Sequence, residues 1–193
     1  MRNCCWLSAL AWTLVAGCST VQTTTHIYYG DFGPQVDEMV CVLTPTAGNQ
    51  AAGTVVFKQD QGFVKVIANV SGLTPGKHGF HVHHLGDTRA VDGMATGGHF
   101  DPKGHPHGGP GSARRHAGDL GNLEADATGT AHLEWDDYAL QLNGPETILG
   151  RSIIVHAGED DLMSQPTGNA GARVAQGVIG IAKLRAPEEP HAH

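Results

Sequence analysis

The chain has few of the residues on which several classes of protein depend. Aromatic residues make up only 6% of the sequence, and 12 lysines and arginines face 19 acidic residues, for a formal net charge of −7. Basic side chains are not clustered with aromatic ones anywhere along the sequence. We therefore expect neither nucleic acid nor an anionic membrane surface as a partner.

Cysteine is also scarce, and three of the four cysteines, Cys4, Cys5 and Cys18, lie within the first 18 residues. Cys41 alone lies further along the chain. A domain with one internal cysteine cannot be stapled by its own disulfides. Because Cys41 lies in the apolar run Met39–Leu43, we interpret it as a buried structural thiol.

Long hydrophobic runs are missing except at the start. The apolar run Cys4–Val15 follows a basic start and is short for a membrane span, but its length fits the apolar part of a signal peptide. Small residues before Cys18 resemble a bacterial lipoprotein signal. We predict a signal peptide over residues 1–17, a lipidated Cys18 and a polar tether over 18–36 in which Gly33-Pro34 marks a turn. An ordinary secretory leader is the alternative.

The lipoprotein reading also predicts a location. The residue after Cys18 is Ser19 and not aspartate, which resembles lipoproteins sorted to an outer membrane. We expect a periplasmic or cell-surface protein that is attached to a membrane only by its lipid. A cytosolic protein with a fortuitous leader is the alternative, since the internal cysteines of a stapled secreted domain are missing.

What the sequence has in abundance is glycine, with 27 residues, and short runs of alternating apolar and polar residues. No stretch has a convincing helical period. We predict an all-β domain over residues 37–185, an eight-stranded Greek-key β-barrel or sandwich, followed by a histidine-containing tail over 186–193. The expected strands cover residues 39–43, 53–59, 63–70, 77–85, 120–125, 130–135, 151–156 and 177–184. Two long connections, 86–118 and 157–176, are expected to carry function.

Histidines gather around the first of these connections. In a strand, His81 and His83 would project from the same face, which makes half of a metal site. The Gly- and Pro-rich segment that follows adds three imidazoles and a carboxylate: His99, His107, His116 and Asp119. Such a set suits a closed zinc site, and a cluster of neutral imidazoles suits copper. The alternative is a solvated histidine-rich loop.

These motifs resemble the copper/zinc superoxide dismutase family. The similarity rests on G-F-H-V-H at 79–83, the spacing of the four residues from 99 to 119, S-I-I-V-H at 152–156 and G-N-A-G-A-R-V-A-Q-G-V-I-G-I-A at 168–182, and it covers about residues 38–183. The resemblance implies a copper site formed by His81, His83, His99 and His156. It also implies a zinc site formed by His99, His107, His116 and Asp119, with His99 bridging both metals.

The same resemblance assigns further roles. Asp160 would join one copper-ligating and one zinc-ligating histidine and fix their orientation. Arg173 would guide the substrate, and His99 would pass a proton to the product. The implied reaction is the dismutation of superoxide to dioxygen and hydrogen peroxide. A copper- or zinc-binding module without turnover on the same fold is the alternative.

The resemblance also implies a homodimer, paired through the apolar segments 85–86, 148–150 and 177–181. In relatives, a disulfide links the first long connection to the last strand. In this chain the two cysteines would lie near Met94 and at Gln176, and neither position is a cysteine. We therefore expect folding to depend strongly on metal. The second connection contains no lysine, so we expect weak electrostatic steering of an anionic substrate.

Overall fold

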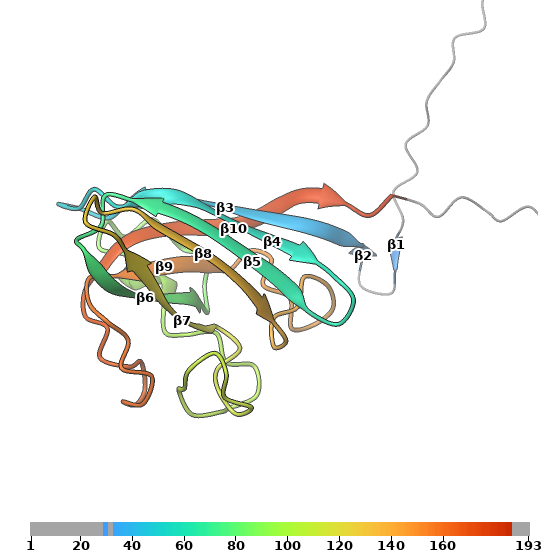
Figure 1. The fold of residues 1–193 in the computed structure, drawn as a ribbon. Coiled ribbons are helices and arrows are strands. Elements are labelled where there is room, and N and C mark those ends of the chain that lie inside the picture. Colours follow the sequence, from blue (N-terminus) through green and yellow to red (C-terminus); the bar gives the residue numbers. More distant parts are fainter. Residues whose placement is uncertain (1–28, 31–32, 187–193) are drawn as a thin grey trace, which may run out of the picture.

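The structure is a computed structural model that describes residues 29–30 and 33–186. All eight predicted strands are present and close into one antiparallel barrel in the order β10-β3-β4-β5-β8-β7-β6-β9 (Figure 1). The connections β5–β6 and β8–β9 each pass two intervening strands, which is the Greek-key pattern. The barrel strands are β3 (Val36–Pro45), β4 (Ala52–Gln59), β5 (Val64–Ser71), β6 (Gly76–His83), β7 (Asp119–Ala125), β8 (Ala131–Asp137), β9 (Ser152–His156) and β10 (Arg173–Leu184).

Alternation along the strands builds the core. On β5, Val64, Val66, Ala68 and Val70 are buried, whereas the residues between them are partly or fully exposed. These side chains pack inside the barrel with larger residues of the other strands, including Phe57, Phe80, Leu123, Ile153 and Ile179. The period-two pattern of the sequence therefore predicted the correct inner face.

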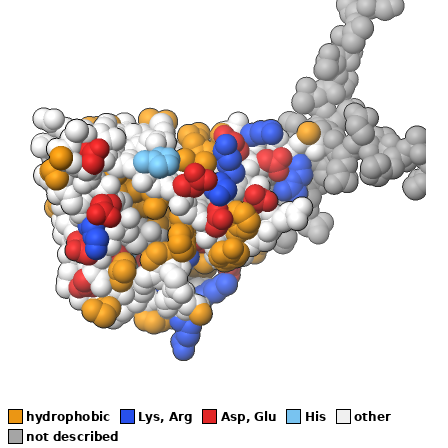
Figure 2. Space-filling model, viewed as in Figure 1, with side chains coloured by type: hydrophobic (Ala, Val, Ile, Leu, Met, Phe, Trp, Pro, Cys, Tyr) orange, Lys and Arg blue, Asp and Glu red, His pale blue; other side chains and the backbone are white. Residues whose placement is uncertain are grey.

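The outer surface over β4, β5 and β8 mixes both signs of charge. Figure 2 shows acidic and basic side chains intermingled on this face of the molecule. Lys65 on β5, for example, lies 2.7 Å from Asp136 and 3.3 Å from Glu134 on β8. The side chains of these pairs are partly exposed to solvent, so the pairs contribute little to stability.

Several strand bounds differ from the sequence prediction: β3 spans residues 36–45 and not 39–43, so it includes the end of the predicted tether, and β6 ends at His83 and not at 85. The last strand begins at Arg173 and not at 177, because Arg173 pairs with His156 and extends the ladder between β10 and β9. Gly33–Pro34 forms a two-residue strand, β2, that pairs with β1 (Tyr29–Gly30), where the sequence predicted a turn within the tether. The predicted signal peptide, the lipidated Cys18 and the tail beyond residue 186 lie outside the described residues.

The two long connections are the first long loop, residues 84–118, and the second long loop, residues 157–172. Figure 1 shows both extending from the side of the barrel formed by β6, β7 and β9. The first loop contains a single 3₁₀ turn, η1 (Met94–Thr96). Across residues 29–30 and 33–186, no helix has the length and apolar character needed to cross a bilayer.

Candidate metal centre

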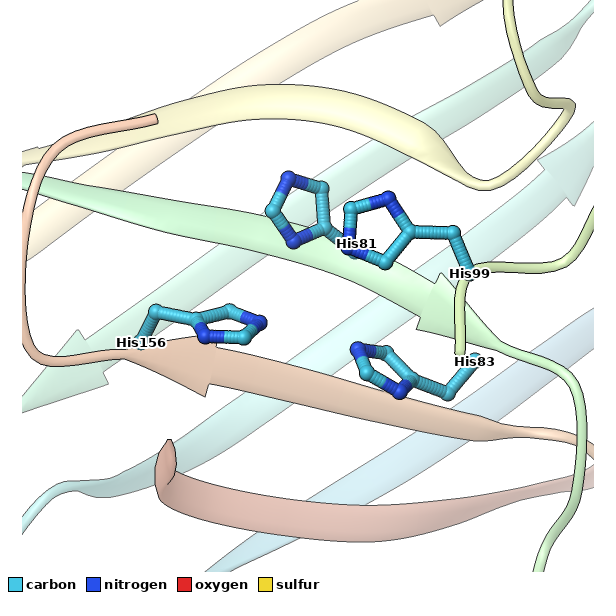
Figure 3. Close-up of side chains that lie close together, drawn as sticks. All are labelled: His81, His83, His99 and His156. Atoms are coloured by element: carbon cyan, nitrogen blue, oxygen red, sulfur yellow. The ribbon is translucent and has the colours of Figure 1, made fainter. Parts of the chain in front are cut away.

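Four histidines converge on the outer wall of the barrel, and we call them the four-histidine group. His81 and His83 come from β6, His156 ends β9, and His99 is brought in by the first long loop, where it pairs with His83 in an isolated β-bridge. Figure 3 shows the four rings turned toward one another. All four are buried, and one nitrogen from each lies within 4.8 Å of the others.

A second cluster, the Asp119 group, adjoins the first and shares His99 with it. Its members are His99, His107, His116 and Asp119. Asp119 Oδ1 lies 2.8 Å from His99 Nδ1, 3.0 Å from His107 Nδ1 and 3.1 Å from His116 Nδ1. The other carboxylate oxygen accepts backbone N–H groups from Gly108 and His116, each at 3.0 Å. One carboxylate oxygen therefore faces three imidazole nitrogens.

The nitrogens that face the centre of the four-histidine group have no hydrogen-bond partner among the described residues. They are His81 Nδ1, His83 Nε2, His99 Nε2 and His156 Nε2. The other ring nitrogens are fixed by the protein; for example, the Nδ1 atoms of His83 and His156 donate to Gly97 O at 2.9 Å and Gly171 O at 3.0 Å. Buried polar atoms normally have a hydrogen-bond partner. Four unpaired ring nitrogens that face one another therefore indicate a metal ion as their partner.

The donor sets fit two different metals. Four imidazole nitrogens suit copper, and three imidazoles with a carboxylate suit a closed tetrahedral zinc site. His99 offers Nε2 to one group and Nδ1 to the other. The residues that the sequence predicted as metal ligands are thus brought together in the two predicted sets.

Asp160 lies between the two groups and is fully buried. Its Oδ2 atom lies 2.8 Å from His81 Nε2, and its Oδ1 atom lies 2.9 Å from His107 Nε2. The chain passes so close at Gly168 that a Cβ there would lie 1.8 Å from Asp160 Oδ1. Only glycine fits at this position, which also has a φ of +68°.

Burial sets the protonation state of the four-histidine group. It lowers the pKa of His81 to about 3 and that of His156 to about 4, and it lowers the pKa of His83 and His99 as well. The hydrogen bond to Asp160 acts in the opposite direction on His81 but does not prevail. These imidazoles are therefore neutral at physiological pH, with lone pairs available to a metal.

The carboxylates of Asp119 and Asp160 set the charge of the Asp119 group. Burial alone would lower the pKa of His107, but its contacts with Asp119 and Asp160 outweigh that effect and raise it to about 9. For both carboxylates burial opposes ionisation, yet hydrogen bonds from the histidines hold each pKa well below its usual range. Both carboxylates are therefore ionised at neutral pH and complement a cation.

Arg173 lies at the start of β10, close enough to the four-histidine group that its charge lowers the pKa of His83 and His156. Its guanidinium is held by three bonds from the first long loop. Nη1 donates to Gly93 O at 2.6 Å and to Thr96 Oγ1 at 2.7 Å, and Nη2 donates to Gly97 O at 2.7 Å. A fixed cation beside the cluster can bind a small anion.

Three buried or loop contacts were not found from the sequence. Gln165 exchanges two hydrogen bonds with the backbone of His107, through Oε1 at 2.8 Å and Nε2 at 2.9 Å. Arg115 is buried and pairs with the buried carboxylate of Asp137. Gln176 donates hydrogen bonds from Nε2 to backbone carbonyls of the first long loop. No sequence motif marks these residues, because each contact joins positions that only the fold brings together.

One other expectation is confirmed. Cys41 is buried, and burial raises the pKa of its thiol to about 12. His84 follows the end of β6 and is exposed. His78 is buried against the backbone of His156, with 2.7 Å between its Nδ1 and that residue's carbonyl oxygen.

A closed Greek-key barrel with two clusters that share one histidine on its outer wall defines a dinuclear metalloprotein. The sequence pattern of the copper/zinc superoxide dismutases matches residues 51–179. An extracellular superoxide dismutase [Cu-Zn] of Brugia pahangi is 46% identical over 152 residues, which cover 74% of this chain and 75% of that protein. The chain belongs to the copper/zinc superoxide dismutase family. It is an oxidoreductase that uses copper and zinc to convert superoxide into dioxygen and hydrogen peroxide.

Proposed function

We propose that the four-histidine group holds copper, that the Asp119 group holds zinc, and that His99 serves both. The observation that carries this assignment is the set of four buried ring nitrogens without partners, all aimed at one point. Copper, when bound, supplies the one-electron redox chemistry of dismutation. Zinc has no redox chemistry and would hold His99 and the first long loop in place.

The chain's own residues orient the substrate and manage protons. Arg173 is held by three hydrogen bonds, and a guanidinium has five donors, so it retains donors for the superoxide anion. His99 Nε2 faces the same space and can carry a proton to the reduced product. Asp160 fixes the orientation of the His81 and His107 rings through one hydrogen bond to each. Complete ligand sets together with Arg173 favour turnover over a binding module without activity.

Metal content tests the assignment. We expect His83→Ala to lose copper and keep zinc, and His116→Ala to lose zinc, with His132→Ala as the exposed control on β8. Copper and zinc per chain would be measured by elemental analysis after loading with both ions. Equal loss of both metals in the two variants, or no loss in either, would contradict the division.

The chain also presents an apolar patch that supports the proposed homodimer. Its residues come from β3, the first long loop, the segment before β9, and β10, and are 39–61% exposed: Val42, Leu85, Leu149, Val178 and Ile181. Gly86 and Gly150 bring the loop segments together, since a Cβ on Gly86 would lie 2.1 Å from Gly150 O. Contiguous exposed apolar residues mark an interaction site, and a second copy of the chain would cover them.

The dimer can be tested by substitution within the patch. Val178→Lys should convert the dimer into a monomer, because an unpaired ammonium would be buried at the interface. Tyr138→Lys is the matched control, since Tyr138 is 76% exposed and lies outside the patch. Light scattering gives the mass in each case. A Val178→Lys protein that keeps the dimer mass would refute the assignment of this patch.

We further propose a location outside the cytoplasm, with attachment through lipid on Cys18. The leader sequence and the extracellular relative support this location. Cys18→Ser should release the protein from the membrane fraction, whereas Cys41→Ser should not. Mass spectrometry of the mature N-terminus would detect the lipid directly. A mature N-terminus without lipid would contradict the proposed anchor.

A further inference from the structure

Arg173 and Gln176 flank the same point of the first long loop. Although they are three residues apart on a strand, a register shift between Arg173 and Ala175 turns both toward this loop. A Cβ on Gly93 would lie 3.2 Å from Arg173 Cδ and 3.5 Å from Gln176 Oε1. Gly93 has a φ of +76°, so glycine suits both the backbone and the narrow space.

Gln176 is a buried polar side chain with 5% exposure. Its Nε2 atom donates to Thr88 O at 3.2 Å and to Ala90 O at 3.0 Å. Its Oε1 atom has no partner within the described chain. Burial of an amide costs free energy unless hydrogen bonds replace its lost contacts with water. Here the two bonds of Nε2 also tie residues 88–90 to β10.

The segment tied by Gln176 leads directly to the segment that holds Arg173. Ala90 O also accepts the backbone N–H of Gly93 at 3.0 Å, and Gly93 O accepts Arg173 Nη1. Thr96, three residues later, bonds to Arg173 and has its Oγ1 3.3 Å from His83 Nδ1. A continuous set of hydrogen bonds therefore runs from Gln176 through the loop to the guanidinium.

We propose that Gln176 is a positioning residue for Arg173. Its amide clasps residues 88–90 of the first long loop to β10 and so fixes the carbonyls of residues 93 and 97 that aim the guanidinium beside the four-histidine group. This inference rests on the proposed role of Arg173 as the group that binds superoxide. The clasp is noncovalent and needs no cysteine, so loop and strand stay together in the absence of a disulfide.

A double-mutant cycle tests the coupling. Gln176→Leu keeps the approximate volume and removes both hydrogen bonds. In the copper- and zinc-loaded protein we expect the second-order rate constant for superoxide to fall about 3- to 10-fold, because loss of one or two hydrogen bonds loosens the geometry of binding. In an Arg173→Ala background, Gln176→Leu should cause no further loss. Gln59→Leu is the matched control, since Gln59 also donates to two backbone carbonyls, far from the site.

Equal losses in both backgrounds, or none in either, would overturn the proposal. A readout independent of turnover is hydrogen exchange of residues 88–97, which should accelerate in Gln176→Leu and stay unchanged in Gln59→Leu. If Gln176→Leu does not fold, Gln176→Met replaces it in both measurements. If Arg173→Ala leaves the rate unchanged, the proposed role of Arg173 fails. Faster exchange in Gln176→Leu would then show a structural clasp only, and the positioning proposal would fall with that role.

Discussion

Replacing Asp160 by asparagine should weaken both metal sites together. The Asp160 carboxylate accepts one bond from His81 and one from His107, and it is fully buried. Asparagine has the same shape but only one oxygen. Its NH₂ group would face a ring N–H of one histidine, so one of the two bonds would be lost and replaced by a repulsive contact.

The size of the effect follows from that single bond. A hydrogen bond to a charged group is worth about 1.5–3 kcal/mol. At about 1.4 kcal/mol for each factor of ten, its loss corresponds to an affinity decrease of about 10- to 150-fold. Outer partners of metal-ligating histidines generally contribute about 10- to 100-fold, which agrees with this estimate. Both metals should be affected, because one ring loses its acceptor and the ring of the other set keeps only a neutral amide oxygen in place of a charged carboxylate oxygen.

Competition with a chelator measures this affinity for copper and for zinc separately. Asp161→Asn is the matched control, because Asp161 is the adjacent carboxylate, is exposed and bonds only to groups in its own loop. We expect this control to retain both metals with wild-type affinity. An Asp160→Asn protein with unchanged affinity for both metals would show that the Asp160 bridge does not support the metal sites. Equal losses in the two variants would show that the loop as a whole, and not the Asp160 bridge, is responsible.

Three further predictions concern stability and reactivity. Arg115→Met should lower the free energy of unfolding by about 3–5 kcal/mol in denaturant titrations, because it leaves the buried Asp137 carboxylate uncompensated, whereas the exposed neighbour Arg114→Met should change it by less than about 0.5 kcal/mol. Cys41 should resist alkylation at pH 8 in the native protein and react fully in denaturant, as peptide mass spectrometry would show, since burial raises the pKa of its thiol to about 12; rapid native alkylation would contradict the buried position. Removal of both metals should lower the melting temperature measured by calorimetry, because buried, unpaired ring nitrogens remain at the site; an unchanged melting temperature would refute the expected metal dependence.

The sequence predicted the strands well, because their period-two alternation is a local signal that the barrel core preserves. It also predicted which imidazoles gather, since His81 and His83 share a strand face and the other ligands follow in one glycine-rich segment. The division of these residues between copper and zinc stays a prediction, carried by resemblance and by the geometry of the unpaired nitrogens.

What the sequence could not predict are contacts between distant positions. The pairing of Arg173 with His156 lengthened β10 beyond its apolar pattern, because a backbone ladder does not require alternating side chains. Gln165 and Gln176 act through backbone atoms of the first long loop, so no residue type in that loop indicates them. In the sequence, Arg115 and Asp137 are indistinguishable from surface charges, because only the fold buries and pairs them.

The proposed roles of copper and Arg173 are tested most directly by the decay of superoxide in the presence of the protein at known copper and zinc content, with and without Arg173→Ala. We expect fast turnover that requires copper and that falls in the variant while its metal content stays unchanged. Full loading with both metals and no turnover would contradict it. So would turnover that Arg173→Ala leaves intact, because the anion would then be bound by another group.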